Sequence, residues 1–181
     1  MDKVAILIDG GYYRKKIDNL YNEKPRARAR ELIDYCRKHL YDNKNKQTGE
    51  LYRIFYYDCP PMGKKIDHPL TQEQMDFSTT PLFKWTNEFL NELKAQRKLA
   101  LRLGYLAEYQ ALYTIKKDVL KDLLSGRKAL ADLIKNDFVV DVKQKGVDMK
   151  IGIDFILDSM WGNIRSDLHE HIDGLITKFP R

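Results

Sequence analysis

The sequence predicts one α/β domain built around a parallel sheet, and an alternation of strand-like and helix-like segments carries this prediction. The strand-like segments are short, apolar and β-prone, and they occur at residues 3–8, 51–57 and 138–142. The first is almost continuously apolar, which is typical of a strand covered on both faces. Helical spacing of apolar residues is found between them, over residues 26–41 and 81–98. This order is typical of parallel strands that are joined by crossover helices.

The remaining segments are assigned from the same kinds of pattern. Alternating leucines predict a further strand over residues 99–107, and two short helices are expected near residues 115–124 and 127–135. Apolar residues at four-residue steps predict an amphipathic helix over about residues 147–161. Residues 62–80 are largely polar and are interrupted by a proline, so they predict a long ordered loop.

The composition bounds the class of protein. The chain has 181 residues, of which 43% are hydrophobic and 32% are charged, and this balance is typical of a globular domain. Residues 1–181 are therefore assigned to a single domain. No apolar run is long enough to cross a bilayer, and the first one ends at Asp9 instead of at the small residues of a signal-peptide cleavage site. The protein is thus expected to be cytoplasmic, with no membrane partner.

Cysteine usage and charge narrow the possible functions. Cys36 and Cys59 have no metal-type spacing, and Cys36 falls on the apolar stripe of its helix, so it is expected to fill the core. The sequence contains no glycine-rich phosphate loop, nucleophile elbow or zinc spacing. The formal net charge of +6 favours a polyanionic partner, because lysine and arginine neutralise phosphates.

Two aspartates follow apolar, β-like runs and are candidates for a metal site. Asp9 comes directly after the first run, and Asp148 lies in the segment Lys145-Gly146-Val147-Asp148 that follows the last one. In open α/β sheets ligands gather outside the carboxyl ends of the strands, and acids that meet there attract a hard cation such as Mg²⁺ or Mn²⁺. The alternative is that each aspartate only caps a helix, since aspartate is a favoured N-cap residue.

A third acid and a set of basic and aromatic residues lie close to these two aspartates in the sequence. Asp154 lies six residues after Asp148, and a solvated helix position is the simpler interpretation of it when the residues are considered alone. Basic side chains can hold a phosphate backbone, and tyrosines can stack on unpaired bases. The candidate substrate-binding residues are Tyr12, Arg14, Lys15, Lys16, Lys143, Lys145 and Lys150. An ordinary charged surface is the alternative, but both groups flank the same two aspartates, which favours nucleic acid.

Three motifs resemble those of the NYN domain family, the branch of the PIN-like nucleases that includes the LabA- and limkain-like proteins. They are VAILIDGGYY, RIFYYDCPP and QKGVDMKIGID, and the resemblance runs from Val4 to Asp154. It implies a PIN-like three-layer α/β/α fold around a parallel sheet. It also implies that Asp9 and Asp148 are metal-site carboxylates, with Asp154 as a supporting catalytic acid. Asp58, in the second motif, matches a recurring family position to which no role is assigned.

The chain departs from the family pattern in two places. Many members have asparagine three residues after the first aspartate, where this chain has Tyr12. Typical members also continue, after the helix that follows KGVD, into a strand ending in a Ser-Gly-Asp-Ser-Asp type motif, which this chain lacks. Residues 162–181 are therefore interpreted as an atypical C-terminal tail. The sheet is expected to be narrowed by the loss of a C-terminal strand, with one unpaired edge that favours a homodimer.

The resemblance implies a metal-dependent ribonuclease that hydrolyses phosphodiester bonds of RNA. Because one acidic motif is missing, the acidic site is expected to be incomplete, with Mg²⁺ or Mn²⁺ binding and catalysis weak or absent. The alternative is a non-catalytic RNA-binding or homodimeric assembly module, which would keep the basic surface without the chemistry.

Overall fold

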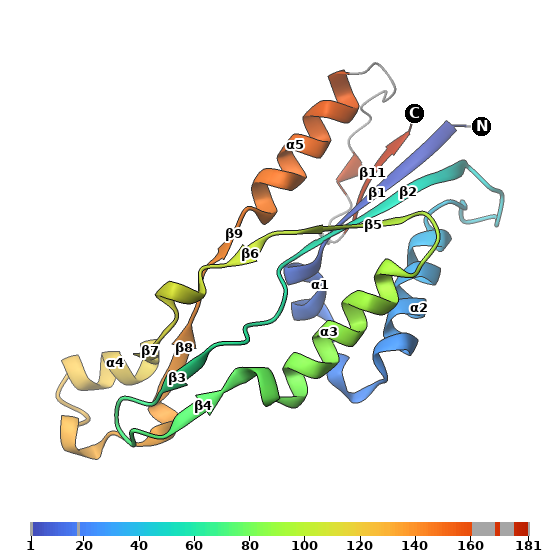
Figure 1. Cartoon of the computed structure of the whole chain (residues 1–181). Helices are drawn as coiled ribbons and strands as arrows, with labels where there is room; N and C mark the ends of the chain where they lie inside the picture. Colours follow the sequence, from blue (N-terminus) through green and yellow to red (C-terminus); the bar gives the residue numbers. More distant parts are fainter. Residues whose placement is uncertain (1, 18, 161–168, 171–175, 181) are drawn as a thin grey trace.

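The computed structural model describes residues 2–17, 19–160, 169–170 and 176–180. Its main sheet has the strand order β10-β11-β1-β2-β5 (Figure 1). β1 and β2 are parallel, β2 and β5 are parallel, and β11 runs antiparallel to β1. The bounds of these strands are β1 Asp2–Asp9, β2 Gly49–Asp58, β5 Leu99–Leu103, β10 His169–Glu170 and β11 Ile176–Pro180. The predicted α/β class and its parallel strands are confirmed.

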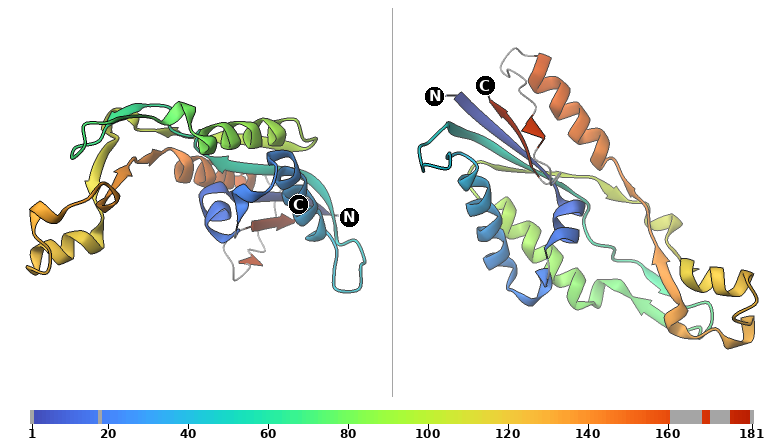
Figure 2. Two further views of the ribbon diagram at one scale, coloured as in Figure 1. Left: turned by 90° about the horizontal axis from the view of Figure 1, so that it is seen from below. Right: turned by 180° about the vertical axis from the view of Figure 1, so that it is seen from behind.

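Helices cover both faces of the parallel strands. One face of β1 and β2 packs on three helices, α1 (Gly10–Lys16), α2 (Pro25–Lys38) and α3 (Pro81–Lys94). The opposite face packs on α5 (Val147–Met160), which lies across the sheet from α2 and α3 (Figures 1 and 2). This burial on both sides is the physical reason for the continuous apolar run that begins the sequence.

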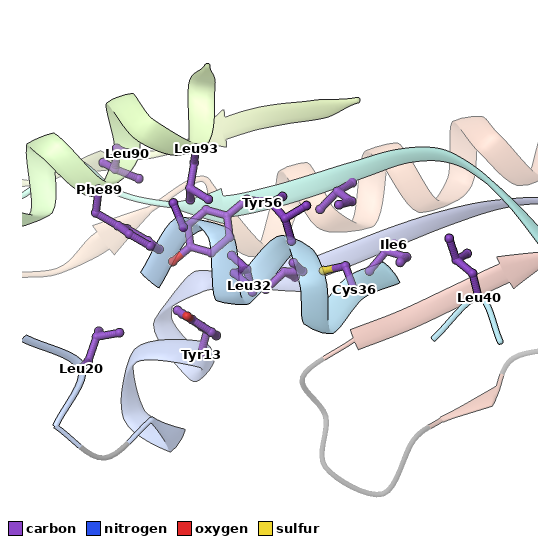
Figure 3. Close-up of a cluster of buried hydrophobic side chains, with 14 of the residues drawn as sticks. Ile6, Tyr13, Leu20, Leu32, Cys36, Leu40, Tyr56, Phe89, Leu90 and Leu93 are labelled. Carbon is purple, nitrogen blue, oxygen red and sulfur yellow. The ribbon is translucent and has the colours of Figure 1, made fainter. Parts of the chain in front are cut away.

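The larger core lies between β1, β2 and the helices α1 to α3 (Figure 3). Alternate strand residues such as Ile6 and Tyr56 point into it, as the two-residue period of a strand requires. Cys36 is fully buried there, and burial raises the pKa of its thiol to about 12. The prediction that this cysteine fills the core is confirmed. Cys59 lies in the core on the α5 face, and both cysteines are free.

The ends of the predicted helices agree with simple capping rules. α2 and α3 each begin with a proline, whose missing N–H costs nothing in a first turn. The Thr80 hydroxyl accepts a hydrogen bond from the backbone N–H of Phe83 and so caps α3. Within the described part of the chain, no helix is both long and apolar enough to span a bilayer.

An arm made of residues 62–80 and 105–145 extends away from the main sheet (Figure 1). Its short strands pair as antiparallel ribbons, β3 with β4, β6 with β9, and β7 with β8. The bounds are β3 Lys65–Asp67, β4 Gln74–Asp76, β6 Tyr105–Leu106, β7 Leu112–Ile115, α4 Lys117–Leu124, β8 Phe138–Asp141 and β9 Gln144–Lys145. His68 is buried where two ribbons meet, and its ring contacts Tyr113 and Phe138.

The arm accounts for most of the segments that were predicted wrongly. The apolar run at 138–142 is strand β8, but it pairs with β7 and does not join the parallel sheet. The loop expected over 62–80 contains the β3–β4 ribbon, and the helix expected over 127–135 is replaced by the 3₁₀ turns Leu130–Asp132 and Lys135–Asp137. A local pattern of apolar residues predicts a strand but does not specify which strand it pairs with. A strand of an antiparallel ribbon and a central strand of a parallel sheet can therefore have the same sequence pattern.

The tail over residues 162–181 was expected to supply no strand of the sheet, but residues 176–180 form β11. β11 pairs antiparallel along β1, with Val4 opposite Pro180 and Ile8 opposite Ile176. The apolar stretches of this tail were judged too short for a central strand that is buried on both faces. β11 is not such a strand, because only the two-residue strand β10 lies beyond it in the sheet. Backbone pairing close to the margin of a sheet does not need both faces to be buried. Among the described strands β5 still lies at a margin of the sheet without a further partner, so the homodimer expected from an unpaired edge stays a prediction.

Candidate functional site

The parallel strands of the main sheet end together in a row of acids and glycines. Asp9 ends β1, Asp58 ends β2 and Leu103 ends β5, and hydrogen-bonded register places Asp9 beside Tyr57 and Asp58 beside Leu103. We call this end of the sheet, with residues 9–11, 58–59 and 103–104, the carboxyl rim. Ligands of open α/β sheets gather at such an end because the strand termini and following turns leave a crevice there.

The helix that carries Asp148 begins at the carboxyl rim. Val147 belongs to the same buried cluster as Cys59, and a β-carbon on Gly104 would lie only 2.9 Å from Cγ2 of Val147 and 3.1 Å from Sγ of Cys59. Asp148 is the next residue, exposed in the first turn of α5. The sequence placed Asp148 at this end of the sheet because a parallel strand was expected to end just before it. That reason is wrong, because the strand before α5 is β9, which pairs with β6 outside the main sheet. The helix α5 nevertheless begins at this rim.

Asp9 is the N-cap of α1. Its Oδ1 atom accepts a hydrogen bond of 3.1 Å from the backbone N–H of Tyr12, and the residue is only partly buried. The segment that leads to α5 lies close by, since a β-carbon on Gly11 would be 3.2 Å from Asp9 Oδ1 and 3.9 Å from Oε1 of Gln144. The capping interpretation is thus confirmed. It involves one carboxylate oxygen, so a cap and a metal ligand are compatible roles for the same side chain.

Asp58 forms a buried ion pair with Arg14, a partnership that the sequence did not reveal. Asp58 is only 1% exposed, and it also accepts hydrogen bonds from Cys59 N at 2.7 Å and from the Tyr56 hydroxyl at 3.3 Å. Burial acts to lower the pKa of Arg14, but the hydrogen bond and charge of Asp58 outweigh it, so that pKa is raised. A β-carbon on Gly10 would lie 2.7 Å from Asp58 Oδ2, which explains the glycine. Arg14 therefore neutralises Asp58.

Asp154 is bound to side chains of the sheet. It accepts a hydrogen bond of 2.9 Å from the Tyr57 hydroxyl and one of 2.8 Å from Arg102 Nε. The guanidinium of Arg102 also lies 5.3 Å from the centre of the Phe55 ring, within the range of a cation–π contact. This acid attaches α5 to β2 and β5. The solvated position that the residue pattern favoured for it is wrong.

Replacing Asp154 by asparagine is expected to lower the free energy of unfolding by about 1 kcal/mol or less. The effect is small because the Arg102 side chain is 42% exposed and water screens the pair. Asparagine can still accept the hydrogen bond from Tyr57, so the attachment of α5 to β2 should remain. Urea titration of the two proteins measures the change. A loss as large as that of a buried ion pair would contradict screening of the pair by water.

The predicted basic residues lie on the two segments that meet at the carboxyl rim. Lys15 and Lys16 are exposed on α1, and Lys16 Nζ lies 5.3 Å from the centre of the Tyr12 ring. Lys143 and Lys145 are exposed on the segment before α5. Lys150, on α5 itself, donates a hydrogen bond to the backbone oxygen of Leu103. The lysines therefore flank Asp9 and Asp148 in the sequence, whereas Arg14 pairs with the buried Asp58.

The candidate acids differ in whether an arginine neutralises them. Among the described residues, no three histidine, cysteine, aspartate or glutamate side chains gather as a metal-binding group. Arg14 pairs with Asp58 and Arg102 with Asp154, so Asp9 and Asp148 are the two acids that could contribute a carboxylate to a metal. One or two carboxylates are enough for Mg²⁺, which keeps waters and phosphate oxygens as its other ligands.

Comparisons with protein-family models, with curated proteins and with solved structures found no match to this chain. Its functional interpretation therefore depends on the geometry of the carboxyl rim.

Proposed function

We propose that this chain is a PIN-like, NYN-type nuclease domain that binds single-stranded RNA at its carboxyl rim, through Mg²⁺ or Mn²⁺ held by Asp9 and Asp148. The observation that carries the proposal is the position of α5, whose first turn begins beside the strand ends where Asp9 lies. Two acids from distant parts of the sequence then belong to one end of the sheet. The three motifs that resemble the NYN family contain both acids, which supports the same assignment.

Each group at the rim has a separate task in this proposal. Asp9 and Asp148 hold the ion, which, when bound, supplies positive charge that polarises a phosphoryl oxygen. The exposed lysines that flank the acids in the sequence neutralise neighbouring phosphates of the strand. Tyr12, beside Asp9, offers an aromatic ring for a base. Arg14 keeps Asp58 neutralised, so the buried carboxylate does not repel the phosphates.

Cleavage of RNA is proposed to be weak or absent. Two further acids that could assist, Asp58 and Asp154, are each paired with an arginine. The site would thus have two carboxylates for the metal, and fewer negative charges compensate less for the dehydration of Mg²⁺. This observation favours the alternative function, a non-catalytic RNA-binding module. A homodimer, expected from an unpaired sheet edge, stays a prediction, since β5 lies at a margin of the described sheet.

The Asp9→Asn and Asp148→Asn variants are each expected to weaken Mg²⁺-dependent binding of single-stranded RNA by roughly tenfold or more. Loss even of a group that only orients a metal ligand costs about 10–100-fold in metal affinity, so loss of a ligand should cost at least as much. Fluorescence anisotropy with a labelled RNA measures binding with and without Mg²⁺ or Mn²⁺, and gel electrophoresis detects cleavage in the same samples.

Asp118→Asn is the matched control, because Asp118 is also an exposed acid in the first turn of a helix, α4 in the arm. It should change neither binding nor cleavage. Cleavage that both rim variants abolish would establish the nuclease. Metal-dependent binding without cleavage would establish the RNA-binding module. If the two rim variants bind RNA as the native chain does, the proposed site is wrong.

A further inference from the structure

A small pocket opens between α1, α3 and the chain that follows β2, beside the carboxyl rim. Its volume is about 200 Å³, and it is lined by Cys59 of the rim, by Arg14, which pairs with Asp58, and by Gln144 of β9. Pockets for drug-sized ligands measure about 300–1,000 Å³. This one is therefore of a size to hold one planar ring system and not a whole nucleotide.

The walls of the pocket are apolar and rigid. Pro60 and Pro61, which follow β2 after Cys59, line it together with Leu82 and Leu106. The pyrrolidine rings fix the backbone there, so little conformational freedom remains to be lost when a ligand binds. A planar apolar face would be desolvated on entering such a slot.

Three side chains give the pocket its polar and aromatic character. Arg14 is held by Asp58 through one nitrogen, and a guanidinium has five N–H donors, so its plane is fixed while other donors can serve a ligand. Tyr21 is 46% exposed, and its ring stands edge-on to Trp85 with the ring centres 4.9 Å apart. Gln144 has an amide that both donates and accepts, and its Oε1 would lie 3.9 Å from a β-carbon on Gly11.

We propose that this pocket binds one unpaired base of the RNA strand, with guanine preferred. The inference rests on the proposed function, because it assigns a base site to the strand held at the rim. Single-stranded RNA is recognised when a base leaves the stack, lies on an aromatic or guanidinium plane and pairs through its edge. Tyr21 supplies the plane, and Arg14 supplies donors for the edge of the base. Guanine presents two neighbouring acceptors, O6 and N7, to which arginine donates.

The test measures how one base changes the affinity of an otherwise uniform RNA. Heptamers of uridine are compared with heptamers that carry a single central guanosine, adenosine or cytidine, by fluorescence anisotropy with Mg²⁺. The guanosine heptamer is expected to bind roughly tenfold more tightly than uridine alone, in the range of one base-specific arginine contact. Adenosine and cytidine should gain less, because each presents an amino donor where guanine or uracil has an acceptor.

Tyr21→Ala is expected to remove most of the guanosine preference while the affinity for the uridine heptamer stays nearly unchanged. Tyr35→Ala is the matched control, because Tyr35 is similarly exposed, at 43%, and lies on α2 outside the pocket. Thermal unfolding shows that each variant is folded. Gln144→Leu, at an exposed position, gives a second variant that should reduce the preference without affecting the core.

The outcomes separate this inference from the function on which it rests. Equal affinities for the four heptamers would overturn the base pocket and leave the RNA site at the rim intact. A guanosine preference that neither Tyr21→Ala nor Gln144→Leu reduces would do the same. If RNA binding does not depend on Mg²⁺, or if Asp9→Asn does not weaken it, both proposals are overturned together.

Discussion

Replacing Arg14 by alanine is expected to lower the free energy of unfolding by about 3–5 kcal/mol. Asp58, its partner, is 1% exposed and would be left as a buried carboxylate without a cation. Hydrogen bonds from Tyr56 and Cys59 would remain, but neutral donors do not cancel a charge. The cost of removing one member of a buried pair is therefore much larger than the net value of the pair. Urea titration followed by tryptophan fluorescence measures the loss.

Two further variants test the cause of this loss. Arg127→Ala removes an exposed ion pair with Asp122, whose side chains are 68% and 45% exposed, and should cost about 0–1 kcal/mol. Adding Asp58→Asn to Arg14→Ala should restore part of the stability, since the buried charge is then gone. Equal losses for Arg14→Ala and Arg127→Ala, or no recovery in the double variant, would show that Arg14 does not neutralise a buried charge.

Gly104→Ala should destabilise the protein by about 1–3 kcal/mol through overpacking. A β-carbon at this position would lie 2.4 Å from the backbone oxygen of Lys145 and 2.9 Å from Val147 Cγ2. A backbone atom cannot rotate away as a side chain can, so the segment leading into α5 must shift. Because Asp148 follows that segment, metal-dependent RNA binding should decrease together with stability.

Gly152→Ala is the control for this substitution on the same helix. In the part of the chain that the structure describes, no atom beyond the neighbouring residues and the helix's own backbone lies within 4 Å of a β-carbon added at Gly152, which is inside α5. Alanine in a helix interior is favoured over glycine by about 0.5–1 kcal/mol, so this variant should be more stable than the native chain. Thermal and urea unfolding compare the two. If both alanine variants change stability in the same direction, close packing at Gly104 is not what requires the glycine.

The elements of the main sheet could be predicted where their pattern has one physical explanation. The continuous apolar run of β1 requires burial on both faces, and α2 and α5 supply it. α3 has a proline in its first turn and apolar residues at helical spacing, and it forms as expected. The pairing of β8 could not be predicted, because its residues suit an antiparallel ribbon as well as a parallel sheet. β11 was missed because its pairing with β1 uses backbone groups that every residue has.

The candidate site was predictable in part. Asp9 directly follows a strong strand signal, so its place at the strand end could be deduced from the sequence. Asp148 reached the same rim by another route, the burial of Val147 in one cluster with Cys59, which no local pattern contains. Arg14 was assigned to phosphate binding because it lies among lysines. Its pairing with Asp58, 44 residues away, depends on how α1 packs against β2, and that is a property of the folded chain.

The antiparallel course of β11 has a practical consequence for experiments on this protein. Because Val4 lies opposite Pro180, the chain leaves the sheet at nearly the place where it enters, as Figure 1 shows. Ile8 lies opposite Ile176, so Asp9 is at the other end of this strand pair from Val4 and Pro180. A dye, an affinity handle or a biosensor surface attached at either terminus would therefore be a strand length away from the acids, and immobilised protein would present them to solution.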